Sequence, residues 1–474
     1  MIAALVLAAV AGAYVPAAHH TISTANPQAQ AAFDRGLVLL YAYNGDAAYQ
    51  AFDEALRVDP HLAMAAWGEA MAAGPDLNTP ITQARFERAQ QAAQQAQALE
   101  IYASAPERLY IDAIALRYAG TIAQREADEA QYRAAMALAV KRLPLDDDAA
   151  TIDAEALLEH TGVEKPDPQA MVLITHVLSR DPYHMFANHL CMHAEDFAPD
   201  RSEAVVCANR VASWSVDPAE EHFAHLPAHT YTEIGDYAKA LASSETAWAL
   251  REQWNAQPDP PYELRYGPHD AYTGWTDALM LGNLETALKW AQRVGHEYDG
   301  SDLWATWARF GAWQKIAASS SANEFYAPLA RGLADLHFGS ASQARAMLAL
   351  YGNIDADYRW LLAAAVDEHD GRIADAVNAL NRAIAYQARE DGAEQLPVFP
   401  AGEALGALYY RHARYDEAAA AFSAALARYP NDPRALYGLA LAQKALGQAV
   451  SSQHTLKSFA SIWNAPTPPD LGDL

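Results

Sequence analysis

Two histidine pairs in this sequence have the spacing of metal ligands. His189 and His193 lie in ANHLCMHAED, and His225 and His229 lie in FAHLPAHTY. A separation of four residues puts both members of a pair on one face of a helix. Imidazole nitrogens bind copper, zinc and iron, and an i, i+4 pair can chelate one ion. The two pairs therefore predict a transition-metal site.

The pairs recur at the length of a helical repeat. Stepping back 34 residues from His189 and His193 leads to Glu155 and Glu159. A period near 34 is one helix–turn–helix repeat, so three successive repeats carry Glu/Glu, His/His and His/His at equivalent offsets. His269 lies near the start of the following repeat. We expect one or two ions, held in one groove by His189, His193, His225, His229, His269 and Glu155.

The identity of the metal depends on the carboxylates. Glu155, Glu159 or Glu195 as ligands would favour iron or zinc, whereas an all-imidazole set would favour copper. The glutamates can instead orient the imidazoles from outside the coordination sphere. Glu195 and Glu159 are also the candidates for a catalytic base.

Helices must position these residues. Of the 474 residues, 52% are hydrophobic, and alanine is prominent among them. Alanine, leucine, glutamate, glutamine and arginine favour helix, and no stretch alternates as a half-buried strand does. Small residues at fixed offsets mark close approaches between helices, and a proline ends the second helix. This repeat pattern is clearest in one C-terminal stretch, at Leu405, Gly406, Tyr409, Ala418, Phe422, Ala425 and Pro430.

The predicted fold is all-α, a tetratricopeptide-like helix–turn–helix solenoid with a right-handed superhelix. Pro-rich segments at 74–82, 161–168 and 255–268 predict loops. Trp304, Trp307, Phe310 and Trp313 have helical spacing and are expected in the core. We divide the chain into 1–18, a signal peptide; 19–150, N-terminal repeats; 151–300, the histidine-rich repeats; 301–464, C-terminal repeats; and 465–474, a disordered tail.

The N-terminus and the cysteines bear on location. Ile2 to Ala11 is an apolar run followed by small residues, as in a signal peptide, although a preceding Lys or Arg is missing. We expect a periplasmic or secreted protein. Cys191 and Cys207 fit one on each helix of a hairpin, either as a disulfide or as two buried thiols. Cleavage before His19 and His20 would create a further copper ligand.

The formal net charge of −26 disfavours nucleic acid and anionic membranes as partners. No segment after the apolar start is a transmembrane candidate. The expected partner is a small-molecule substrate or a peptide in the concave groove. Tyr231, Tyr272 and Trp275 either line such a groove or belong to the repeat core.

Several stretches resemble a group of bacterial tetratricopeptide-repeat proteins. They include HHTISTANPQAQAAFDRGLVLLYAYN, AMAAWGEAMAAGPDLN, NHLCMHAED, HLPAHTYTEIGDY and LGALYYRHARYDEA, and the resemblance runs over most of 19–464. It implies the solenoid fold and a groove lined by offsets 2, 5 and 9 of each first helix. The segments equivalent to NHLCMHAE and HLPAH are that group's distinctive feature, and no function transfers with them.

Three functions remain open. The first is a metalloenzyme, either an oxidoreductase or a hydrolase, with open coordination positions. The second is a peptide-binding or protein-binding scaffold without catalysis, which the fold alone favours. The third is metal storage or handling. Histidines that bind an acidic or aromatic ligand directly, or that only pack, are the alternatives to a metal.

Overall fold

The computed structural model describes residues 14–258, 260–262, 264–297, 300–319, 326–390 and 396–472. Within these ranges the secondary structure is helical, apart from two isolated β-bridges. The chain divides into two compact units, one of residues 1–227 and 246–264 and the other of residues 228–245 and 265–474. The predicted boundaries at 150 and 300 follow repeat content and stay a prediction. The apolar stretch Ile2–Ala11 lies outside the described residues.

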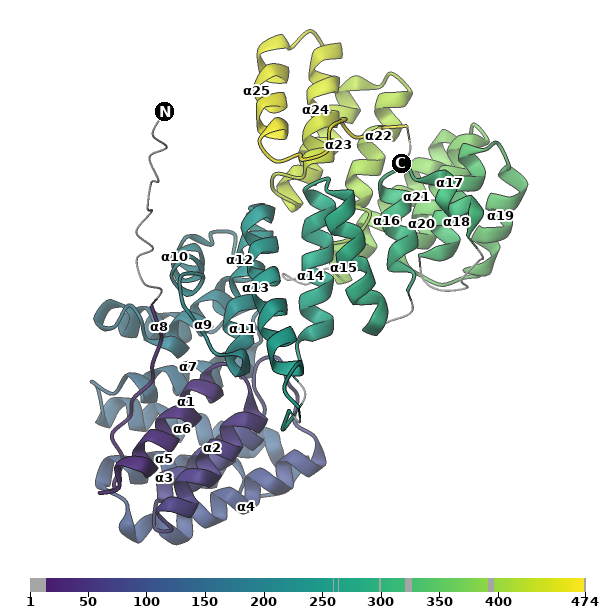
Figure 1. The fold of residues 1–474 in the computed structure, drawn as a ribbon. Helices are drawn as coiled ribbons and strands as arrows, with labels where there is room; N and C mark the ends of the chain where they lie inside the picture. The colour runs from purple at the N-terminus through teal and green to yellow at the C-terminus, as the bar shows by residue number, and fades with distance from the viewer. Residues whose placement is uncertain are drawn as a thin grey trace, which may run out of the picture. The chain divides into compact units, whose positions relative to one another are not determined.

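The first unit is a series of helical hairpins (Figure 1). Consecutive helices pair as α1 with α2, α3 with α4, α5 with α6, α7 with α8 and α9 with α10. Their bounds are α1 Pro27–Tyr41, α2 Gly45–Val58, α3 Ala63–Ala73, α4 Gln83–Leu99, α5 Ala105–Arg117, α6 Arg125–Arg142, α7 Asp147–Thr161, α8 Pro168–Arg180, α9 Met185–Glu195, α10 Ser202–Val211 and α11 Glu221–His225.

The second unit has the same construction, with α14 on α15, α18 on α19, α20 on α21, α22 on α23 and α24 on α25. Helices α12 Pro227–Glu233 and α13 Tyr237–Asn255 have residues in both units. The remaining helices are α14 Gly267–Met280, α15 Leu284–Glu297, α16 Asp302–Arg309, α17 Trp313–Ala318, α18 Ala327–His337, α19 Ala341–Leu350, α20 Asp357–His369, α21 Ile373–Glu390, α22 Ala401–Arg411, α23 Tyr415–Arg428, α24 Pro433–Ala445 and α25 Ala449–Ala460.

The same packing motif recurs in both units and identifies the repeat. Phe52 of α2 is fully buried between glycines of α1 and α3, where a Cβ on Gly36 would lie 2.4 Å from its ring. Phe422 of α23 lies in the same way between Gly406 of α22 and Gly438 of α24. A large residue of one helix thus fills the space left by small residues on two neighbours. This confirms the predicted all-α, tetratricopeptide-like repeat, while the superhelical sense stays a prediction.

The C-terminal segment corrects one expectation. The composition of residues 466–474 predicted disorder, but Leu471 is buried against the core cluster that contains Phe422. Arg411 donates a hydrogen bond to the carbonyl of Leu471, and Arg434 donates one to the carbonyl of Asp470. Two arginine side chains therefore fix a backbone that composition alone marks as unstructured.

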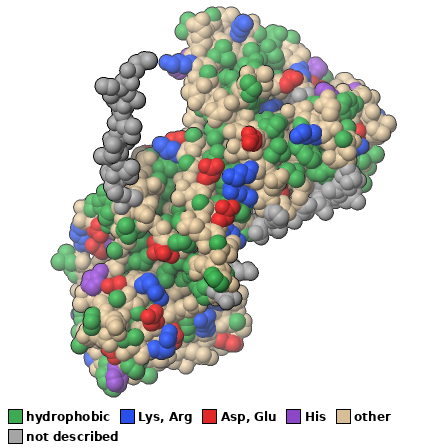
Figure 2. All heavy atoms as spheres, in the orientation of Figure 1, with side chains coloured by type: hydrophobic (Ala, Val, Ile, Leu, Met, Phe, Trp, Pro, Cys, Tyr) green, Lys and Arg blue, Asp and Glu red, His purple; other side chains and the backbone are tan. Residues whose placement is uncertain are grey.

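The surface and the helices bear on the expected partners. On the face shown in Figure 2, acidic and basic side chains are interspersed, and few histidines are visible. In the described part of the chain, no helix is long and apolar enough to cross a membrane.

Candidate metal centre

His189 and His193 lie one turn apart on α9, and both are buried. The helix begins where His184 caps it, because the Nδ1 atom of His184 accepts a hydrogen bond from the amide of Ala187. The ring centroids of His189 and His193 are 5.0 Å apart. The predicted pairing on one helix face is therefore present.

His222 of α11 completes a three-histidine cluster, which consists of His189, His193 and His222. Its ring centroid lies 5.2 Å from that of His189 and 6.4 Å from that of His193. One nitrogen of each ring lies within 4.8 Å of the other two. The sequence prediction missed His222, although it stands at offset 2 of the repeat whose offset 5 is His225. That offset is one of the groove positions that the family resemblance implies.

Two cluster members are oriented through their second nitrogen. The Nδ1 atom of His189 lies 2.6 Å from the carbonyl oxygen of Tyr41, and the Nδ1 atom of His193 lies 3.1 Å from a carboxylate oxygen of Asp196. A carbonyl and a carboxylate are acceptors, so each Nδ1 carries the proton and Nε2 carries the lone pair. Metal-bound histidines have this arrangement, in which the outer acceptor fixes the tautomer and the ring orientation.

Tyr43 forms one wall of the cluster. Its ring centroid is 4.2 Å from that of His189, and its ring stacks on His193 and His222 at 6.3 and 6.0 Å. It has a φ of 53°, a left-handed conformation that is uncommon outside glycine. The chain leaving α1 adopts this conformation and places a buried aromatic ring against all three imidazoles.

The predicted glutamates do not join the cluster. Among the described side chains, Glu155 is in none of the groups whose donor atoms are close enough to share an ion. It lies on α7, where burial and the neighbouring charge of Glu159 raise its pKa. Glu155 as a metal ligand therefore stays a prediction.

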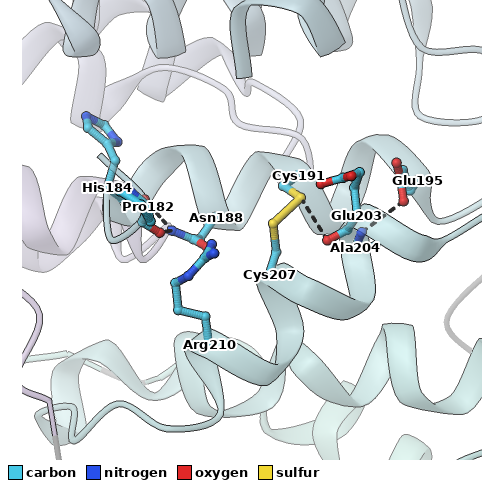
Figure 3. The surroundings of a disulfide bond; sticks show 9 residues. All are labelled: Pro182, His184, Asn188, Cys191, Glu195, Glu203, Ala204, Cys207 and Arg210. Atoms are coloured by element: carbon cyan, nitrogen blue, oxygen red, sulfur yellow. Dashed lines mark hydrogen bonds between the residues drawn. A yellow bond between two sulfur atoms is a disulfide. The ribbon is translucent and has the colours of Figure 1, made fainter. Parts of the chain in front are cut away.

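The two candidate bases have structural partners. Glu159 accepts a hydrogen bond from Arg117, 2.5 Å away, and the same guanidinium also bonds Glu129. Burial raises the pKa of Glu159 to about 7. Glu195 accepts the amide hydrogen of Ala204 at 2.9 Å and so caps α10 (Figure 3). These contacts hold the hairpins together, and a role for either carboxylate in proton transfer stays a prediction.

The other predicted ligands fall in both units. His225 is buried at the end of α11 in the first unit. His229 and His269 belong to the second unit, where their Nε2 atoms are 3.1 Å apart and their rings meet edge to face. At this distance, one imidazole nitrogen donates a hydrogen bond to the other. The structure thus gathers a three-histidine cluster in one unit and a two-histidine pair in the other.

Asp277 lies close to this pair in the second unit. It is fully buried and accepts a hydrogen bond from Thr232 at 3.0 Å. Burial raises its pKa well above the usual range, although the charge of His229 opposes the shift.

The aromatic residues near the histidines belong mainly to the core. Trp275 is fully buried and donates its indole hydrogen to Thr306 at 2.8 Å, and Tyr231 is also buried. Tyr272 packs edge to face on Trp275. Among the predicted core residues at 303–313, Trp304 and Trp313 are buried. The core interpretation therefore holds for Trp275, Tyr231, Trp304 and Trp313.

A disulfide braces the helix that carries two of the cluster histidines. Cys191 lies between His189 and His193 on α9 and is bonded to Cys207 on α10, with the Cα atoms 6.5 Å apart (Figure 3). The prediction left a disulfide and two free thiols open, and the structure has the disulfide. It ties α9 to its hairpin partner at the level of the cluster.

Among known proteins, only solved structures show a similarity to this chain. No family model matches the chain, and no curated protein matches it. The structure of the anaphase-promoting complex subassembly Cut9–Hcn1 is similar over 92% of this chain and 73% of the other, at 14% identity and a TM-score of 0.30. The tetratricopeptide domain of P58(IPK) is similar over 89% of this chain and 99% of its own, at 15% identity and a TM-score of 0.24. The human IFIT1 dimer with m7Gppp-AAAA is similar over 90% of this chain and 90% of its own, at 12% identity and a TM-score of 0.33.

Proposed function

We propose that this protein binds a transition-metal ion at His189, His193 and His222. The observation that carries the proposal is the convergence of three buried imidazoles, two of which are oriented by the carbonyl of Tyr41 and the carboxylate of Asp196. Burying polar rings together has a cost that coordination offsets. The donor set is all nitrogen, which favours copper or zinc over the iron that a glutamate ligand would favour.

Three protein ligands suit a reactive ion better than a structural one. Structural zinc sites have four protein ligands, whereas catalytic sites have three and leave a position for water or substrate. A zinc ion in such a site activates water, and a copper ion supports redox chemistry. We therefore propose a metal-dependent enzyme as the function, ahead of metal storage. The Cys191–Cys207 disulfide supports export to an oxidising compartment, which we propose as the location.

Metal analysis of the untagged full-length protein tests the binding. We expect about one copper or zinc ion per chain at this cluster after reconstitution and gel filtration. His193→Ala and His222→Ala each remove it, whereas the matched control His160→Ala, at an exposed position of α7, retains it. Circular dichroism confirms that the variants fold. Equal metal content in the wild type and in both folded cluster variants would overturn the proposal.

The open position has its own test. Cobalt placed in the site gives a visible spectrum that reports the number and geometry of its ligands. Azide shifts this spectrum if a coordination position is exchangeable, as an enzyme requires. A spectrum that azide and cyanide both leave unchanged points to storage.

A second candidate function is peptide binding by the second unit. A cavity of about 280 Å³ there is lined by apolar residues that include Trp313, Leu333 and Leu361, and also by Glu368 and Arg411. It can take one or two apolar side chains of an extended segment. Phage-displayed peptides selected on the wild type should lose binding to Leu333→Arg and keep it to His193→Ala. A selection that enriches no sequence rejects this function.

A further inference from the structure

The first unit contains a second group of residues whose donor atoms are close enough to share a metal ion, and these residues line a cavity. The cavity has a volume of about 660 Å³, within the range of small-molecule and cofactor sites. It is bounded by residues 17–21, by the connection from α6 to α7 and by the start of α9. The three-histidine cluster is not part of its lining.

Asp148 lines this cavity, and its two oxygens have different surroundings. Oδ1 accepts a hydrogen bond from the Tyr41 hydroxyl at 2.5 Å and lies 3.4 Å from Nε2 of His184. Oδ2 lies 2.8 Å from Nδ1 of His20. Each oxygen of Asp148 therefore has its own partner, and these contacts hold the carboxylate in place.

His184 orients this carboxylate and is not a ligand. Its Nδ1 accepts the amide hydrogen of Ala187, so its Nε2 carries a proton and donates it toward Asp148. Tyr41 and His184 are thus two donors on one oxygen. Carboxylates that bind metals are commonly held in this way by outer hydrogen bonds.

Asp146 supplies a third donor atom. A ring nitrogen of His20, an oxygen of Asp146 and an oxygen of Asp148 all lie within 4.8 Å of one another. The Oδ1 atom of Asp146 accepts the amide hydrogen of Ala149 at 3.0 Å, which fixes the side chain at the start of α7. Ligands bound at about 2.0–2.2 Å lie roughly 3 Å apart around an ion, so the 2.8 Å approach of His20 to Asp148 suits a shared ion.

We propose that His20, Asp146 and Asp148 form a second metal site, which takes a divalent first-row cation such as Mn²⁺ or Fe²⁺. One imidazole and two carboxylates make a harder donor set than three imidazoles, so the two sites differ in metal preference. Asp181 also lines the cavity, whereas the charge of Asp147 is paired with Arg180. Binding displaces the Nδ1 proton of His20. The cavity leaves room for water or an oxygen ligand on the ion.

Tyr41 connects the two sites. Its hydroxyl bonds Asp148, and its carbonyl accepts from Nδ1 of His189. The second site does not depend on the metal at the three-histidine cluster, because it shares none of the ligands. Failure of one proposal therefore leaves the other standing.

Manganese titration of the full chain, followed by the electron paramagnetic resonance signal of free Mn²⁺, tests the second site. We expect one bound Mn²⁺ per chain in the wild type and in His193→Ala. Asp148→Asn and His20→Ala should each weaken binding at least tenfold. The control Asp147→Asn removes a neighbouring charge whose partner is Arg180, and it should bind as the wild type does.

Tyr41→Phe provides a variant that keeps all three ligands. It removes the donor to Asp148 and retains the carbonyl for His189, so Mn²⁺ binding should weaken while the cobalt spectrum of the three-histidine cluster is unchanged. If Asp148→Asn fails to fold, Tyr41→Phe still tests the second site. The proposal is overturned if the wild type binds no Mn²⁺, or if Asp147→Asn loses as much binding as His20→Ala, which would indicate diffuse attraction by the acidic surface.

Discussion

The backbone carbonyl of Tyr41 accepts a hydrogen bond from Nδ1 of His189 at 2.6 Å, across 148 residues of sequence. Tyr41 is the last residue of α1, where a carbonyl has no partner within its own helix. The end of a helix in the first repeat thus fixes the tautomer of a histidine several repeats away. The carbonyl of Tyr41 and the buried imidazole of His189 thus satisfy each other.

Asp196 should tune the metal affinity without binding the ion. Its carboxylate holds Nδ1 of His193, so Asp196→Asn should weaken metal binding by about 10–100-fold and leave the stoichiometry unchanged. Competition with a chromophoric chelator measures the change. Glu195→Gln alters a neighbouring carboxylate that caps α10, and it should keep the wild-type affinity. Equal losses in both variants would mean that Asp196 acts only through general charge.

The disulfide should contribute to stability. Cys191 and Cys207 are 16 residues apart, and closing a loop of that length stabilises the folded state by about 3 kcal/mol. The double variant Cys191→Ala, Cys207→Ala should lose roughly this much in urea unfolding. Dithiothreitol should destabilise the wild type by a similar amount and leave the double variant unaffected. A reductant effect of the same size on both proteins would contradict this prediction.

Asp153 should make the first unit less stable at pH 8 than at pH 5. Burial, with the charge of Asp167, raises its pKa from 3.8 to about 7. An acid whose pKa is raised on folding favours the folded state most at low pH, and this advantage is lost as pH rises from about 4 to 7. Asp153→Asn should therefore stabilise the protein by about 2–3 kcal/mol more at pH 8 than at pH 5.

Urea unfolding at the two pH values checks this. The control is Asp112→Asn, which removes the same charge at an exposed position of α5. It should show no such pH dependence. A stabilisation by Asp153→Asn that is equal at pH 5 and pH 8 would rule out titration of Asp153 as the cause.

The repeat packing predicts a steric cost at Gly438. A Cβ there would lie 2.2 Å from the ring of Phe422, so Gly438→Ala should lower the free energy of unfolding by about 1–3 kcal/mol. Adding Phe422→Leu makes room for the methyl group. The double variant should be destabilised by less than the sum of the two single changes, as chemical denaturation measures. Additive losses would show that the glycine is not constrained by this ring.

The fold could be predicted from the sequence because the contacts within a repeat are local. Gly406, Phe422 and Gly438 pack within neighbouring helices, and a period near 34 residues makes such contacts readable from spacing. The placement of Cys191 and Cys207 on the two helices of one hairpin could also be predicted from their spacing. Residues 74–82, predicted as a loop, lie between the end of α3 and the start of α4. The tail was misjudged because Arg411 and Arg434, which hold it, are distant in sequence from Leu471 and Asp470.

For the candidate site, the sequence by itself determined that His189 and His193 share a helix face, since that follows from 3.6 residues per turn. Only the tertiary structure decided which other side chains reach them. The repeat offsets of Glu155, His225 and His229 did not show which of them lie close enough to share an ion, because a coordination bond of about 2 Å needs a finer placement than repeat register specifies. Packing placed His222 in the cluster, bonded Glu159 to Arg117 and set Tyr41 between two groups of ligands.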